Sequence, residues 1–65
     1  MTLAQRFARK ACQLVPHHQD LQEIDPALDS PEAIDEIMFR RSEYLGGMAA
    51  VILALIAREG AAEDA

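Results

Sequence analysis

The sequence predicts an all-α, single-domain protein: a short amphipathic N-terminal helix, an acidic connector and a long C-terminal helix, arranged as a hairpin. The chain has 65 residues, which allows one domain at most, and 51% of them are hydrophobic, as is typical of a folded protein. Helix-capping residues precede both of its apolar stretches. Apolar and polar residues do not alternate over any long stretch, so no strand is expected. We expect the domain to span residues 1–60 and residues 61–65 to form a frayed tail.

The first helix is expected from Thr2 to Val15. Thr2 is a favourable N-cap residue, and Pro16 disfavours the helical conformation at the residue before it. Apolar residues recur at spacings of three or four, which places them on one face of a helix. That face contains Ala4, Phe7, Ala11 and Leu14.

Residues 16–30 form an acidic connector without Lys or Arg. Leu21, Ile24 and Leu28 are spaced like anchors, which predicts one or two helical turns; a mobile linker is the alternative. We expect the basic residues of the first helix to lie against this acidic part of the chain. Its carboxylates are also the candidate electrostatic surface for a partner, formed by Asp20, Glu23, Asp25 and Asp29.

The second helix is expected to begin after Ser30, with Pro31 as its first residue, and to end near Glu59. Gly60 is the expected stop in the left-handed conformation. Its second half, from Leu45 to Ala57, contains no charged residue. As an alternative to one continuous helix, the two adjacent glycines at positions 46 and 47 could divide it into two segments.

A helix that is apolar on all sides must be surrounded, and one short helix covers only one stripe of it. We therefore expect the remaining surface to bind a second copy of the chain, closing a homo-oligomeric bundle, or another protein. A purely intramolecular core is the alternative. A line of small residues, Gly46, Ala50, Ala54 and Ala57, would let a second helix approach closely. The predicted interface consists of Leu45, Met48, Ala50, Val51, Ile52, Ala54, Leu55 and Ile56.

Several classes of protein are disfavoured by the residues that are present. Cys12 is the one cysteine, which excludes an intramolecular disulfide, and no catalytic or metal-binding motif is apparent, so we expect neither enzymatic activity nor a cofactor. The longest uncharged run has 14 residues and as a helix would span about 21 Å, short of the roughly 30 Å of a bilayer core. Without a secretory signal pattern, the cytoplasm is the expected location.

These observations favour a small cytoplasmic interaction module, an adaptor, inhibitor or co-chaperone that acts by stoichiometric helix–helix binding, and as a dimer. The alternative is a small DNA-associated regulator that presents the basic N-terminal helices of a dimer, with Arg6, Arg9 and Lys10 facing phosphates. A third hypothesis is a metal or redox site at Cys12 and the adjacent His17 and His18.

The stretch from Ser30 to Ile56 is loosely similar to the co-chaperones of type III secretion needles. The similarity consists of a proline-started helix with a Gly-Gly step and an apolar end. The first helix is shorter and the connector longer than in that family, so the likeness implies no more than the partner-binding class.

Overall fold

All regular secondary structure in the described part of the chain is helical. The structure is a computed structural model that describes residues 1–64, with the side chains of residues 1–60. The elements are α1 (Leu3–Leu14), the short 3-10 helix η1 (Gln19–Leu21), α2 (Pro31–Arg41) and α3 (Glu43–Asp64). The predicted all-α class is therefore confirmed. The first helix is found close to its expected bounds, whereas the expected long second helix is present as two helices.

The N-terminus of α1 is fixed by a capping box and by the connector. The Thr2 hydroxyl accepts a hydrogen bond from the Gln5 N–H at 3.3 Å, and the Gln5 side chain accepts one from the Thr2 N–H at 2.9 Å. The Leu3 N–H donates to a carboxylate oxygen of Asp29 at 2.8 Å, and the Ala4 N–H donates to the Leu28 carbonyl at 3.0 Å. These bonds satisfy helix N–H groups that have no partner within the helix.

The connector contains the expected helical turn, η1, which places Leu21 in the core with no exposed surface. Arg41, at the end of α2, holds this turn from the outside. Its guanidinium donates to the backbone carbonyls of Asp20 at 2.5 Å and Glu23 at 2.9 Å. The acidic connector thus does contact a basic residue. The contact differs from the expected one, because the arginine belongs to α2 and it binds backbone carbonyls instead of carboxylates.

The prediction of one continuous helix from Ser30 to Glu59 is wrong, because the helix is interrupted at Ser42. This residue is extended, with φ −173° and ψ 141°. Its N–H closes α2 on the Met38 carbonyl at 3.1 Å, and its hydroxyl accepts from the Tyr44 N–H at 3.1 Å, which caps α3. The alternative break at the two glycines is also wrong, since both lie inside α3.

The expected stop at Gly60 is absent as well. The helix α3 continues through Gly60 to Asp64, and no described glycine has a positive φ. A glycine can remain in a helix at a cost of about 1 kcal/mol relative to alanine. The frayed tail over residues 61–65 stays a prediction, and Ala65 lies outside the described residues.

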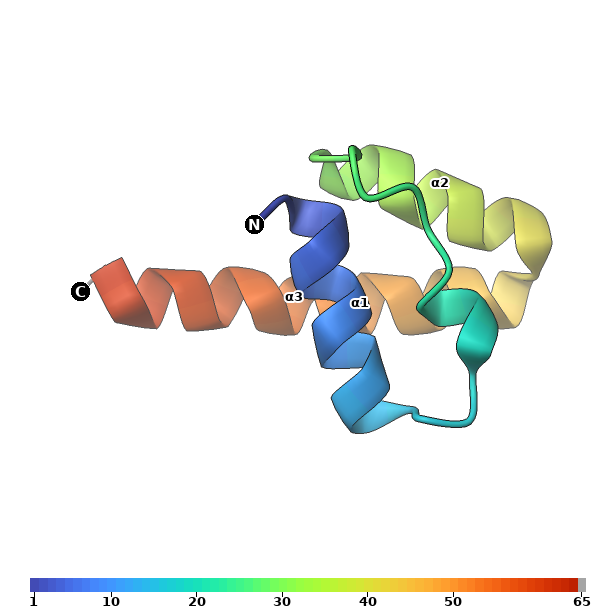
Figure 1. The fold of residues 1–65 in the computed structure, drawn as a ribbon, viewed down its shortest axis with the longest axis horizontal. Coiled ribbons are helices and arrows are strands. Elements are labelled where there is room, and N and C mark those ends of the chain that lie inside the picture. Colours follow the sequence, from blue (N-terminus) through green and yellow to red (C-terminus); the bar gives the residue numbers. More distant parts are fainter. Residues whose placement is uncertain (65) are drawn as a thin grey trace.

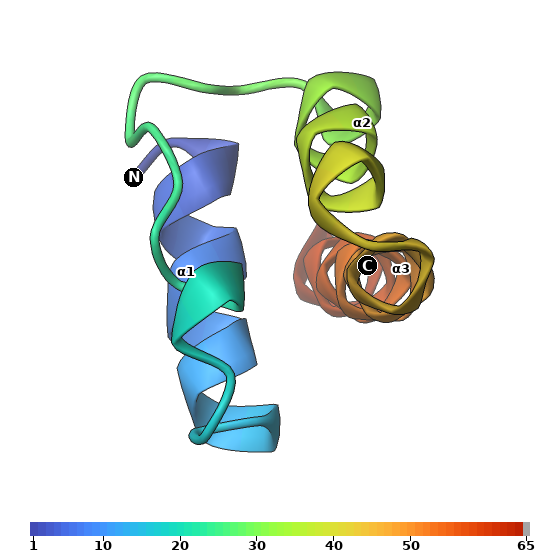
Figure 2. The same ribbon diagram turned by 90° about the vertical axis from the view of Figure 1, so that its right-hand side faces the viewer.

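The break at Ser42 determines the arrangement of the helices. α2 folds back along α3, and α1 crosses α3 instead of lying along it (Figure 1). Viewed along α3, the other two helices cover adjacent sides of it and leave its remaining side uncovered (Figure 2). The hairpin is therefore formed by α2 and α3, and the expected antiparallel packing of α1 along the long helix is not found.

The core lies where the four elements meet. α1 contributes the face expected from its spacing, except that Leu14 is 50% exposed. α3 contributes residues four, three and four positions apart, which form one stripe of the helix. The buried apolar residues are Ala4, Phe7, Ala11, Leu21, Ile34, Met38, Leu45, Ala49, Ile52 and Ile56.

Candidate functional site

The side of α3 opposite the core is exposed and uncharged, and we call it the outer face. Its residues lie between Tyr44 and Ala57, and none of the residues in this stretch is charged. Tyr44 is 62% exposed and Val51 is 61% exposed. The outer face consists of Tyr44, Gly47, Ala50, Val51, Ala54 and Ala57.

The residues predicted as an interface are divided between the two sides of α3. Three of them are buried against α1 and α2, namely Leu45, Ile52 and Ile56. Met48 and Leu55 are half-buried between the two sides, and Ala50, Val51 and Ala54 are exposed on the outer face. The intramolecular core thus accounts for part of the predicted set, and the exposed part remains available to a partner.

Three residues of the outer face, Tyr44, Gly47 and Ala57, were not among the predicted interface residues. A helix that is apolar on every side gives no amphipathic signal, so its exposed side cannot be read from the sequence. The positions of α1 and α2 supply the missing information, because they bury one side of α3. Gly47, Ala54 and Arg58 are exposed on the opposite side.

The predicted line of small residues is also divided. Gly46 faces inward, where an added Cβ would lie 2.9 Å from Cα, Cβ and Cδ2 of Phe39, so it is the glycine that allows α2 and α3 to approach. Gly47 faces outward, and an added Cβ there would have no neighbour within 4 Å. Gly46 therefore allows close packing of α2 on α3 within the chain. Gly47, Ala50 and Ala54 would allow close approach of another molecule to the exposed side of α3.

The N-terminal part of the outer face borders an open apolar groove of about 420 Å³ between α3 and the end of α1. Leu14 and Val15 line one side of it, and Tyr44, Met48 and Val51 line the other. The Tyr44 ring lies against His18, with ring centroids 5.6 Å apart and tilted by 51°. The groove and the outer face together form a continuous apolar surface.

The acidic residues predicted as a partner surface have different roles in the connector. Asp29 caps α1, and a carboxylate oxygen of Asp25 accepts from the Ala27 N–H at 2.9 Å. Glu23 accepts from the Gln19 side chain at 2.8 Å. All four, including Asp20, are exposed. Asp29 and Asp25 thus hold local backbone, and Asp20 and Glu23 are the better candidates for contact with a partner.

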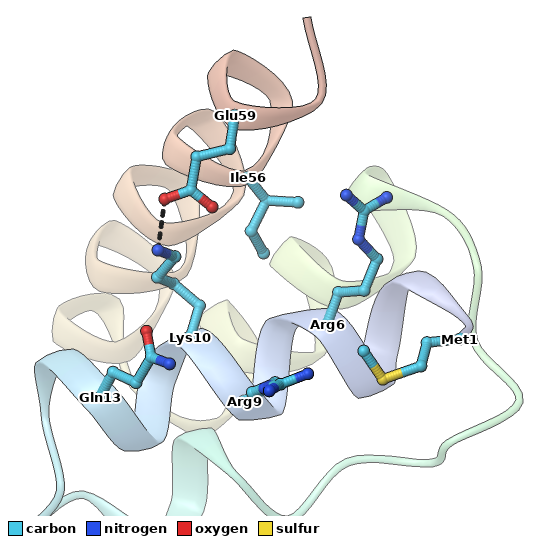
Figure 3. Close-up of a pocket in the computed structure, with 7 residues that line it drawn as sticks. All are labelled: Met1, Arg6, Arg9, Lys10, Gln13, Ile56 and Glu59. Atoms are coloured by element: carbon cyan, nitrogen blue, oxygen red, sulfur yellow. Dashed lines mark hydrogen bonds and ion pairs between the residues drawn. The ribbon is translucent and has the colours of Figure 1, made fainter. Parts of the chain in front are cut away.

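The basic residues of α1 surround an open hollow of about 190 Å³ near the C-terminal part of α3 (Figure 3). Arg6 and Arg9 line it, and Lys10 forms an ion pair with Glu59 across it. The lysine charge is therefore balanced by a carboxylate within the molecule. This leaves two of the three cations on which the DNA-binding hypothesis rests.

Among the described residues, no group of three or more His, Cys, Asp and Glu side chains lies close enough to hold a metal ion. Cys12 is exposed on α1.

None of the helices in the described part of the chain is long and apolar enough to cross a membrane. The pKa of Glu32 is lowered by a hydrogen bond from its own backbone N–H and by one from the Ser30 hydroxyl.

Comparison with known proteins gives no match to a family model, to a curated protein or to a solved structure. The class of the protein follows from its fold and surface alone: a small all-α protein in which one helix has an uncharged, exposed outer face.

Proposed function

We propose that this chain is a small non-enzymatic interaction module that binds another protein stoichiometrically through the outer face of α3. It would act as an adaptor, an inhibitor or a co-chaperone in the cytoplasm. The observation that carries this proposal is the exposure of Tyr44 and Val51, at 62% and 61%, on a helix face that is uncharged over about four turns. Contiguous exposed apolar surface is characteristic of interaction sites.

The shape of the surface favours a helix as the bound element. Glycine at position 47 and alanine at positions 50 and 54 keep the outer face flat, so a helix backbone can approach it closely. The adjacent groove, lined by Leu14 and Met48, offers room for larger apolar side chains. Binding of an amphipathic helix in an apolar groove is a common mode of recognition.

The negative charge of the chain would orient the partner as it approaches and would increase the association rate. The chain has a net charge of −5, and Asp20 and Glu23 are exposed on the connector. Surface charges of this kind mainly affect the association rate and its salt dependence, while buried apolar contacts determine the lifetime of the complex. We therefore expect a partner other than this chain itself to combine an apolar helix with basic residues at its edge.

A matched pair of variants, each with one alanine replaced by glutamate, tests the proposal. Ala54→Glu places a charge on the outer face, and Ala27→Glu makes the same change at an exposed position of the connector. The tagged wild type and both variants are immobilised and offered an extract of the cells that make the protein, together with an untagged copy. The retained proteins are then quantified by mass spectrometry.

Proteins retained by the wild type and by Ala27→Glu, but lost with Ala54→Glu, would support the proposal. Equal retention by all three chains would show that the outer face does not mediate binding. Retention of nothing would also contradict it. Circular dichroism of both variants serves as the control for folding.

A further inference from the structure

We infer that the outer face of α3 binds a second copy of the same chain, with the two α3 helices antiparallel and a two-fold axis between Ala50 and Val51. This inference rests on the proposed function, because it uses the same surface and names its partner. The uncovered side of α3 is open along the helix, with α1 and α2 on its other sides (Figure 2). A two-fold pairing needs a self-complementary surface, in which each residue of a pair meets the other on the opposite chain.

The outer face has this self-complementarity in the antiparallel register. Positions equally distant from the midpoint between residues 50 and 51 lie at the same level across the axis. The six residues of the outer face form three such pairs, and all six are exposed. Along the helix axis, Tyr44 of one copy lies level with Ala57 of the other and Val51 lies level with Ala50, so each larger side chain shares its level with an alanine. Gly47 lies opposite Ala54, where the backbones can approach most closely.

The ends of the outer face carry the charge complementarity that selects this register. Glu43 and Arg58 border the uncharged stretch, both are exposed, and neither forms an ion pair within residues 1–60. They are equally distant from the midpoint, so Glu43 of each copy meets Arg58 of the other. Within one chain they are separated by about 22 Å of helix and cannot pair.

Parallel pairing is disfavoured by the same two residues. It would place Glu43 against Glu43 and Arg58 against Arg58, which is repulsive at both ends. An antiparallel pairing shifted by one turn would separate Glu43 from Arg58 in both ion pairs, and Tyr44 would no longer lie level with Ala57. The charges therefore distinguish one register from its alternatives.

Charge reversal tests the register directly. The mass of the wild type is measured by light scattering over a concentration series from about 1 µM to 1 mM, since an interface formed by one helix is small. Each copy of Glu43→Arg or Arg58→Glu would form two like-charge contacts with its own kind, and we expect the Kd of self-association to rise about tenfold. The double variant exchanges the charges and should return to the wild-type Kd. Arg9→Glu, at an exposed position of α1, makes the same change of charge as Arg58→Glu away from the outer face; it is the matched control and should leave the Kd unchanged.

Mixing the two single variants gives a test that does not depend on the folding of the double variant. In the mixed dimer both contacts join opposite charges, so the mixture should associate like the wild type while each variant alone does not. A wild type that stays monomeric over the whole series would overturn the inference. So would a dimer unaffected by either reversal, or one that the double variant fails to restore.

The outcome separates this inference from the proposed function. A monomer that still retains another protein through Ala54 would contradict the second copy as partner and leave the interaction module intact. A dimer that retains only its own untagged copy would support the inference and contradict an adaptor for other proteins.

Discussion

The same substitution should have different effects on stability at the two adjacent glycines of α3. Gly47→Ala adds a Cβ that has no neighbour within 4 Å, so the variant gains the helix propensity of alanine and nothing opposes it. That gain is about 1 kcal/mol. For a domain of this size it corresponds to a rise in Tm of about 4–8 °C.

Gly46→Ala receives the same gain in propensity but creates a close contact. The added Cβ would lie 2.9 Å from Cα and Cβ of Phe39 as well as from its ring. Because Cα belongs to the backbone, α2 as a whole would have to move away from α3. Overpacking of this kind costs about 1–3 kcal/mol, so the variant should be about 1–3 kcal/mol less stable than Gly47→Ala.

The assay is thermal and urea unfolding of the wild type and both variants, followed by far-ultraviolet circular dichroism. One low protein concentration is used throughout, so that self-association contributes equally little to each. A Gly46→Ala variant as stable as Gly47→Ala, or more stable, would contradict this expectation. That result would mean that Phe39 does not pack on Gly46 and that the α2–α3 hairpin is differently arranged.

Three further changes test the elements that hold the outer face in place. Ser42→Ala should destabilise the fold by about 1 kcal/mol because α3 loses its N-cap, whereas Ser42→Asp should retain it; urea unfolding measures both. Arg41→Ala should speed amide hydrogen exchange in η1 at least about fivefold, and unchanged exchange would show that its bonds to the connector are unimportant. The pKa of Glu32 lies below its ordinary value of 4.5, so its carboxylate stabilises the fold above that pH and the contribution is lost as the pH falls through the lowered pKa. Glu32→Gln should therefore flatten part of the acid dependence of Tm, and an unaltered dependence would contradict this assignment.

The starts of the helices could be predicted because their signals are local. Thr2 caps α1, and Ser30 followed by Pro31 begins α2, as the sequence indicates. The break at Ser42 also has a local signal, which the interpretation as one helix overlooked. Arg40 and Arg41 suit the negative end of a helix, and Ser42 followed by Glu43 suits the beginning of the next.

The direction of α1 and the exposed side of α3 could not be predicted in the same way. A crossing angle depends on how side chains of two helices interdigitate, which spacing within one helix does not determine. The apolar stretch from Leu45 to Ala57 carries no polar residue to mark its solvent side. Only the positions of α1 and α2 show that Ile52 faces the core and Val51 does not.

The central claim, that the outer face of α3 binds a second copy of the chain, is tested most directly by nuclear magnetic resonance on dilution. Backbone amide resonances of the labelled protein are followed over a concentration series. We expect progressive shifts at Gly47, Val51 and Ala54, with little change at Arg9 and Glu36, which lie on other helices. Shifts confined to α1 or α2, or no shifts at concentrations where the mass increases, would contradict it.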